Sequence, residues 1–487
     1  MSSLGVLLVG VVAVCAPAVL PVLLVLGRQW VALPLVPVVG AVLIGLSTVV
    51  TVALVVPLLV TWLCLAALAN LLALGWWRRG GRPVERIRLD GWTLATAVVG
   101  ALLATAWASN RALSWDVHSF WYSRGRWFLE GPRYVVEQLG SPYTSPYAGS
   151  PHAKYPPVPS ATPALMWDLT GGVDYFSAKL LMAGITASTL VLLSIAVARL
   201  IGSPRWLGGG AALVVPSATL YFATSSSALG HMDLPYAAAG EAALIFGLLL
   251  ARRRAELVVS IALCLLCSLV KNEGFVIAVL VALLVSLRHS QRDLRRFALL
   301  AVPWLAVLGS WRLVVLRIGA GAPTPSGRTQ ADELAALRPL PSPDLLTLVK
   351  LVGTHLWWLT LPLAVGLVAL YLLAHRDPRS APLLRSLAAA VGYHAVIVVP
   401  LLGATGLLVM GGPGLEWDEL VLRTERYMTF TRLALTVCLL LLAASAIRAV
   451  RRPGTDTSQP RASGGLSGSA PAGARQPSRA SGASVAD

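Results

Sequence analysis

Long apolar runs separated by short polar intervals fill the chain up to about residue 450. A helix that crosses a bilayer needs about 20 predominantly apolar residues, and about thirteen runs approach that length. The runs lie at 4–26, 31–50, 52–76, 91–109, 177–200, 207–224, 234–251, 255–270, 275–288, 297–318, 346–373, 386–409 and 430–447. This pattern predicts an all-α protein, a polytopic bundle of about thirteen transmembrane helices. Hydropathy alone allows the stretch 31–76 to be one long helix or two.

Arginine clusters decide that division and predict the orientation. With two helices in 31–76, all the clusters between runs fall on one side of the membrane, which the positive-inside rule makes the cytoplasm. The clusters are Arg28, 78–88, Arg199 with Arg205, 252–254, 288–296, 376–385 and 448–452. The first run lacks a basic leading segment and a convincing cleavage site, so we interpret it as a retained helix and not as a signal peptide.

Composition agrees with a multi-pass protein of the cell membrane. The chain is 56% hydrophobic and only 13% charged, whereas soluble domains are about one quarter charged. Its net charge of +17 does not indicate nucleic-acid binding, because the arginines lie in short clusters that act as topology signals. The five cysteines all fall inside apolar runs, so they predict neither a disulfide framework nor a zinc site. Cys264 and Cys267 have CxxC spacing but are interpreted as packing residues.

The longest polar interval before the tail runs from Trp115 to Trp167, on the side predicted to be extracytoplasmic. It mixes arginines with aromatic side chains, which suits a segment that lies among lipid headgroups. Asp116 could take a proton from an acceptor hydroxyl or bind a hard cation. It could equally cap an interfacial helix that begins near His118. Lys154 precedes a stiff Pro-Pro pair, and it could neutralise a lipid-linked phosphate or simply contact headgroups.

Two short turns between later runs carry further candidates. His231 and Asp233 stand at the head of the run 234–251, where Asp233 could be a helix cap or, together with Asp116 and the two histidines, bind a divalent metal. Lys271 and Glu273 interrupt two apolar runs. Charged residues inside a membrane are usually paired, so Lys271 is expected to pair with Glu273 or with a ligand phosphate. The alternative is an ordinary tight turn whose charges are solvated.

A last polar loop precedes the final run. Arg423 and Arg426 lie there on the side that the positive-inside rule disfavours for arginine. Either of them could therefore meet an anion. The alternative is pairing with Glu419 or Glu425 at helical spacing.

The order of these motifs resembles the GT-C superfamily of membrane glycosyltransferases, which use polyprenyl-phosphate sugars. The resemblance covers about residues 91–450 and rests on Trp115-Asp116, Lys154-Tyr155-Pro156-Pro157, His231-Met232-Asp233-Leu234-Pro235 and Lys271-Asn272-Glu273-Gly274, with Arg426 before the final helix. It implies that Asp116 is the catalytic base, that Lys154 contacts the donor phosphate, and that Asp233 is a second acid near the donor or a metal. In family members whose equivalent lysine is well understood, an acidic residue directly precedes that lysine. Here Ala153 precedes Lys154, which argues against metal binding at this position.

The resemblance divides the chain into three parts. Residues 1–90 are extra N-terminal helices, 91–450 form a GT-C-like catalytic module with an outer loop at 110–176, and 451–487 are a disordered cytoplasmic tail of Gly, Ser, Pro, Ala, Thr and Arg. The implied activity is inverting transfer of a sugar from a polyprenyl-phosphate donor to an extracytoplasmic glycan, lipid or protein. Lys154, Lys271 or Arg426 would stabilise the leaving phosphate, with His118 and Glu273 in support.

The alternative function is a polytopic transporter or lipid flippase. Such a protein would place charged residues near the bilayer midplane and often shows repeated halves. The polar residues singled out here lie in predicted outer loops, and no internal repeat is evident. These two observations favour the enzyme.

Overall fold

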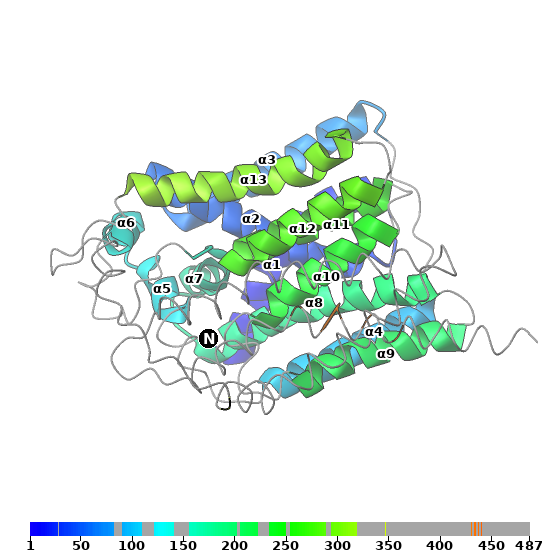
Figure 1. Ribbon diagram of the computed structural model, residues 1–487. Coiled ribbons are helices and arrows are strands. Elements are labelled where there is room, and N and C mark those ends of the chain that lie inside the picture. The colour runs from blue at the N-terminus through cyan, green and yellow to red at the C-terminus, as the bar shows by residue number, and fades with distance from the viewer. Residues whose placement is uncertain are drawn as a thin grey trace, which may run out of the picture. The chain divides into compact units, whose positions relative to one another are not determined.

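The structure is a computed structural model of the 487-residue chain. It describes residues 1–27, 29–81, 90–109, 121–140, 155–201, 205–222, 233–249, 254–288 and 294–318, and the isolated positions 346, 430, 433, 434, 437 and 440. Within these ranges the chain forms helices and no strand, which confirms the all-α class for the described part (Figure 1).

The helices follow the predicted apolar runs closely. The bundle helices are α1 (Ser3–Leu26), α2 (Ala32–Leu54), α3 (Leu58–Arg78), α4 (Gly91–Ser109), α8 (Tyr175–Ile201), α9 (Arg205–Phe222), α10 (Asp233–Leu249), α11 (Arg254–Val270), α12 (Asn272–Arg288) and α13 (Leu294–Arg317). The outer segment contributes three shorter helices, α5 (Ser123–Trp127), α6 (Pro132–Gly140) and α7 (Val158–Thr170). The last three predicted runs and the tail lie outside the described residues apart from isolated positions, so the total of about thirteen spans stays a prediction.

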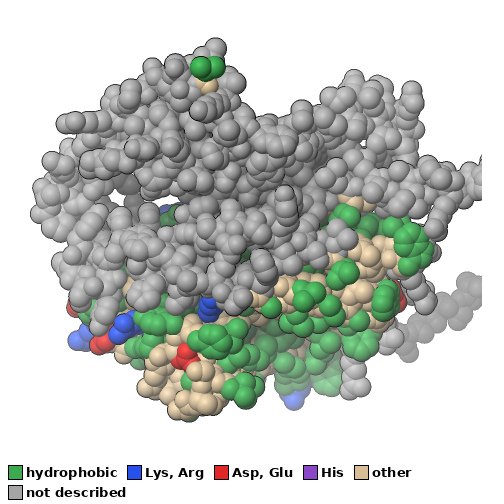
Figure 2. Space-filling view, turned by 90° about the horizontal axis from the view of Figure 1, so that it is seen from below, with side chains coloured by type: hydrophobic (Ala, Val, Ile, Leu, Met, Phe, Trp, Pro, Cys, Tyr) green, Lys and Arg blue, Asp and Glu red, His purple; other side chains and the backbone are tan. Residues whose placement is uncertain are grey.

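Five of the described helices are long and apolar enough to cross a membrane: α1, α2, α3, α8 and the part of α13 from Ala298 to Arg317. Shorter apolar helices include α4, α11 and α12. Helix α3 buries little of its apolar surface against the rest of the bundle. Figure 2 shows a face on which hydrophobic side chains cover much of the described surface. These features are those of a helical membrane protein, in which side chains facing lipid stay apolar.

The stretch 31–76 forms two helices, as the charge pattern predicted. Helix α2 ends at Leu54, and Val55 adopts the left-handed conformation at φ 55°. Pro57 then caps α3, because proline has no N–H to donate and disfavours a helical residue before it. A 2.6 Å hydrogen bond between the hydroxyls of Thr51 and Thr61 joins the two helices across the turn.

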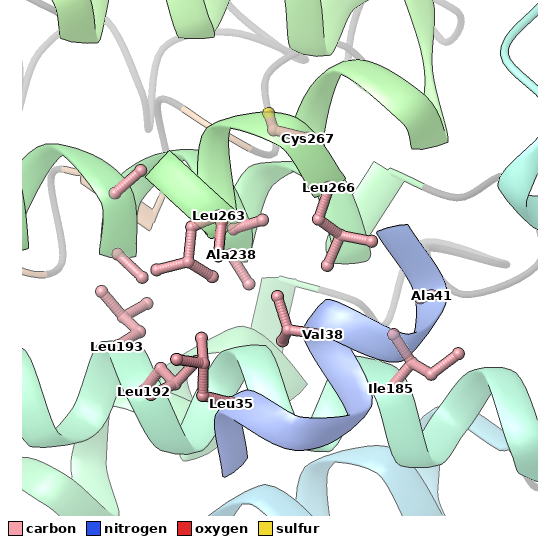
Figure 3. Packing of buried hydrophobic residues seen from close by; sticks show 14 of the residues in the cluster. Leu35, Val38, Ala41, Ile185, Leu192, Leu193, Ala238, Leu263, Leu266 and Cys267 are labelled. Carbon is pink, nitrogen blue, oxygen red and sulfur yellow. The ribbon is translucent and has the colours of Figure 1, made fainter. Parts of the chain in front are cut away.

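Small and branched apolar side chains fill the core of the bundle. Figure 3 shows Leu35, Val38 and Ala41 of α2, which face side chains of α8, α10 and α11. The α8, α10 and α11 residues labelled there are Ile185, Leu192, Leu193, Ala238, Leu263, Leu266 and Cys267. Cys264 and Cys267 are both buried free thiols, which confirms that they are packing residues.

Opposite ends of the bundle carry different polar features. At one end, α5 and α7 lie close to the N-terminus, and α6 lies beyond them near an end of α13 (Figure 1). This end is called the aromatic end, because Trp121 packs on Tyr155 there and Tyr122 stacks on Tyr175. The Ser177 hydroxyl lies 2.7 Å from the carbonyl oxygen of Ser3, which ties the starts of α8 and α1 together. At the other end Arg199 pairs with the buried Glu256 at 3.2 Å. Which end faces the cytoplasm stays a prediction.

Candidate functional site

The outer segment is anchored to the bundle by close packing of α5 on α7. A Cβ at Gly125 would lie only 2.9 Å from the Ser160 carbonyl oxygen, so only glycine allows this approach. Before α5, the ring of Trp121 meets Tyr155 edge-on at 5.6 Å. Tyr122 stacks on Tyr175, with ring centroids again 5.6 Å apart. Burial raises the pKa of the Tyr122 phenol well above its usual value, so this side chain stays neutral.

Two of the predicted motifs meet at Arg312. This arginine lies in the apolar helix α13, and its Nη2 donates a 2.8 Å hydrogen bond to Oδ1 of Asn272. It also lies close enough to Tyr155 for an electrostatic interaction. Tyr155 follows Lys154, and Asn272 follows Lys271 in the sequence. Tyr155 and Asn272, one described residue from each motif, therefore both interact with Arg312, a residue that the sequence analysis did not select.

The Lys271 turn is tighter than an ordinary loop. Helix α11 ends at Val270 and α12 begins at Asn272, which leaves Lys271 as the only residue between them. A Cβ at Gly274 would lie 1.9 Å from the carbonyl oxygen of Cys267, so the sharp reversal requires glycine at 274. This geometry accounts for the glycine of the motif.

Lys271 pairs with Glu273, which is the first of the alternatives predicted for this turn. The ammonium lies 3.7 Å from Oε1 of Glu273, and both side chains are at least nine-tenths buried. The same ammonium lies 5.4 Å from the ring centre of Tyr236. Lys271 is thus already neutralised at close range, and its role toward a donor phosphate stays a prediction.

Arg124 is a cation that sequence analysis did not select. Its side chain is 2% exposed on α5, and its guanidinium lies 5.6 Å from the ring centre of Trp311 on α13. Within the part of the chain that the structure describes, Nε, Nη1 and Nη2 of Arg124 have no hydrogen-bond partner. Burial lowers the pKa of Arg124 to about 9, so the group is still positively charged at neutral pH.

The energetic balance at Arg124 is unfavourable without an anion. A desolvated charge costs several kcal/mol. A cation–π contact returns only about 0.5–2 kcal/mol. The Nε1 atom of Trp127, one turn further along α5, is also buried without an acceptor in the described part. This side of α5 therefore presents several N–H donors that an anion would satisfy.

Most of the other predicted site residues lie outside the described residues. These are Asp116, His118, Lys154, His231 and Arg426. Asp233 begins α10, as expected for a residue at the head of that run, but its side chain is outside the description. Their roles stay predictions, including the cap and metal alternatives for the two acids.

The predicted divalent-cation site lies outside the described side chains. No group of three His, Cys, Asp or Glu side chains that could hold an ion occurs in it. The side chains proposed for a divalent cation, those of Asp116, His118, His231 and Asp233, are not among those searched.

No protein-family model, no curated protein and no solved structure matches this chain. Function must therefore be inferred from its residues and their geometry.

Proposed function

We propose that this protein is an integral-membrane glycosyltransferase that moves a sugar from a polyprenyl-phosphate donor to an extracytoplasmic acceptor with inversion. The observation that supports it is that Arg312 donates a hydrogen bond to Asn272 and interacts electrostatically with Tyr155. The sequence neighbours of the first two, Lys154 and Lys271, are the cations proposed for the donor phosphate. A reaction on a lipid-linked substrate needs such a site at the end of membrane-spanning helices, beside both lipid and water.

The reaction requires a base for the acceptor and cations for the leaving group. The acceptor hydroxyl attacks the anomeric carbon from the face opposite the phosphate, and Asp116 takes its proton. The bond between the anomeric carbon and the phosphate oxygen breaks, and its electron pair leaves with the polyprenyl phosphate. Lys154, Lys271 or Arg426 would stabilise the charge that develops on that phosphate.

The remaining predicted residues have supporting roles. Asp233 with His231 would position the donor or hold a divalent cation, while His118 would assist Asp116. Glu273 would fix Lys271, with which it is paired. Aromatic side chains between 120 and 175 would hold sugar faces and the lipid at the interface. The partners are thus the lipid-linked donor, an envelope glycan, lipid or protein as acceptor, and membrane lipids.

A transfer assay with a lipid-linked donor, beside a separate donor-binding measurement, tests this proposal on the purified full-length protein. Asp116→Asn keeps the size of the side chain but cannot take the proton, so transfer should fall by about 100-fold to 10,000-fold. Donor binding should survive, because the carboxylate acts on the acceptor. Asp233→Asn should weaken donor binding if this acid positions the donor or a metal. Normal turnover by Asp116→Asn would disprove the assigned base.

One described residue favours the transporter or flippase alternative. Glu241 lies midway along α10 and is fully buried, at a depth where ionisable groups often mark a transport path. Exchange of labelled lipid or sugar in proteoliposomes, with Glu241→Gln as the variant, separates the two functions. Exchange that depends on Glu241 but not on Asp116 would favour transport.

A further inference from the structure

We propose that Arg124 is the cation of a buried phosphate site at which α5 and α13 hold the phosphate group of a membrane lipid. The guanidinium is enclosed by protein, lies over Trp311, and keeps all its N–H donors unsatisfied within the described residues. Buried polar groups are almost always hydrogen-bonded, and buried charges are paired. A buried guanidinium without hydrogen-bond partners therefore indicates that an anion binds there when the protein functions.

Three other described cations, Lys271, Arg312 and Arg126, already have polar partners. Lys271 is paired with Glu273, and Arg312 donates to Asn272. Arg126, two residues from Arg124 on the same helix, lies 3.4 Å from the Tyr175 hydroxyl. An incoming anion would have to compete with these partners, whereas at Arg124 it would meet donors that nothing in the described part satisfies.

The shape of the Arg124 guanidinium favours a phosphate as the bound anion. A guanidinium presents parallel N–H donors in a planar fork, which matches two oxygens of a phosphate. The Nε1 of Trp127 adds an unsatisfied donor on the same short helix.

The apolar side chains near Arg124 favour a phosphate that is attached to a lipid. Trp311 belongs to a small apolar cluster at the aromatic end, which also contains Val49 and Val52 of α2, Trp127 of α5, Val135 and Leu139 of α6 and Val315 of α13. An apolar wall next to a single cation suits a phosphate attached to a hydrocarbon chain. Helices α2 and α13 both contain candidate membrane spans, so this cluster is built by helices that can face lipid.

Two lipids share this chemistry, a polyprenyl phosphate and a bilayer phospholipid. If the carrier is the polyprenyl phosphate, the inference rests on the proposed function and adds Arg124 to its donor-binding residues. If the carrier is a phospholipid, the site stands independently of glycosyl transfer. Measuring lipid binding separately from transfer keeps the two questions apart.

The experiment measures equilibrium binding to purified, delipidated full-length protein in detergent. The probes are a long-chain polyprenyl monophosphate, the uncharged polyprenol of the same length, and phosphatidylglycerol. The variants are Arg124→Gln, Arg124→Lys and Arg124→Met. Arg133→Gln serves as the matched control, because it removes one positive charge from an exposed position in the same segment.

The wild type should bind the polyprenyl monophosphate about tenfold to a hundredfold more tightly than the polyprenol, and Arg124→Gln should abolish that difference. Arg124→Lys should keep part of it, since charge survives without the planar fork. Arg133→Gln should behave as wild type. If phosphatidylglycerol shows the same dependence on Arg124 and displaces the polyprenyl monophosphate, the phosphate site stands with a phospholipid as its ligand.

Thermal unfolding of the lipid-free protein supplies a second readout. Arg124→Met removes a buried charge that has no hydrogen-bond partner among the described residues, so the unfolding temperature without lipid should stay the same or rise, while stabilisation by phosphate lipids should disappear. Wild-type binding of both phosphate lipids by Arg124→Gln and Arg124→Met would overturn the proposal. A lower unfolding temperature of lipid-free Arg124→Met would also count against it, because it would make Arg124 a structural residue. Loss of transfer in Asp116→Asn with intact lipid binding would leave the proposed function and the site both standing.

Discussion

Arg312 Nη2 donates a 2.8 Å hydrogen bond to Asn272 Oδ1, and this contact joins the last turns of α13 to the first residue of α12. Asn272 lies in the turn between two predicted runs, whereas Arg312 lies inside the run 297–318 and interrupts an otherwise apolar stretch. A guanidinium in a helix that can span a membrane is costly to leave without a partner. The bond to Asn272 therefore fixes the relative position of the two helices at the aromatic end.

We expect this contact to be measurable by a double-mutant cycle. Asn272→Ala and Arg312→Leu should each lower the free energy of unfolding, and their coupling energy should be about 1.5–3 kcal/mol, as for a hydrogen bond to a charged group. Arg317→Gln, on an exposed position of the same helix, should change stability little. A coupling energy near zero would mean that the bond does not hold the helices together.

The buried pair of Lys271 and Glu273 should depend on both partners. Glu273→Gln leaves an uncompensated buried ammonium, so it should lower stability by about 3–5 kcal/mol. Lys271→Met together with Glu273→Leu should recover most of that loss, because it removes both charges from a buried place. Glu130→Gln on the exposed surface is the control. Chemical unfolding in detergent measures all four, and equal stability of Glu273→Gln and wild type would show that the pair is solvated.

The close approach at Gly274 predicts a position-specific cost. Gly274→Ala would place a Cβ 1.9 Å from the Cys267 carbonyl oxygen, so the turn between α11 and α12 must shift, at a cost of about 1–3 kcal/mol or more. Gly309→Ala in α13 is the matched control, since its Cβ would meet nothing within 4 Å. There alanine should be neutral or stabilise by up to about 1 kcal/mol. Equal thermal shifts for the two variants would contradict the tight turn.

Lys154 should matter for donor use through its charge. Lys154→Ala should weaken transfer strongly, and Lys154→Arg should retain part of it because the charge survives while the geometry changes. The assay is glycosyl transfer at several donor concentrations. Near-wild-type activity in both variants would reduce this lysine to a headgroup contact.

The predicted orientation can be tested by labelling single cysteines from outside the cell. Ser145→Cys should react and Arg253→Cys should not, because the arginine-rich turn is predicted to be cytoplasmic. The background should lack Cys64, which is exposed on α3. Reaction at 253 without reaction at 145 would reverse the topology, and the proposed extracytoplasmic site with it.

The sequence by itself predicted the bundle helices of the described part with good accuracy. Hydrophobic length and helix termination are local properties, so the runs 91–109, 234–251 and 255–270 reappear as α4, α10 and α11 with bounds that differ by at most a few residues. The arginine distribution also separated α2 from α3, because charges between helices report on how often the chain crosses the membrane. Lys271 with Glu273 was within reach of sequence, since the two residues lie in one turn.

Only the tertiary structure distinguished one arginine from another. Arg124 and Arg126 look alike in the sequence, yet Arg124 is enclosed over Trp311 and Arg126 reaches Tyr175. Arg312 appeared only as a charge inside an apolar run until its partner Asn272, 40 residues away, was placed beside it. Desolvation and pairing depend on atoms that the fold brings together from distant segments. The sequence could therefore locate the membrane helices, while the packing of α5, α12 and α13 decided that Arg126, Lys271 and Arg312 have polar partners and that Arg124 has no hydrogen-bond partner among the described residues.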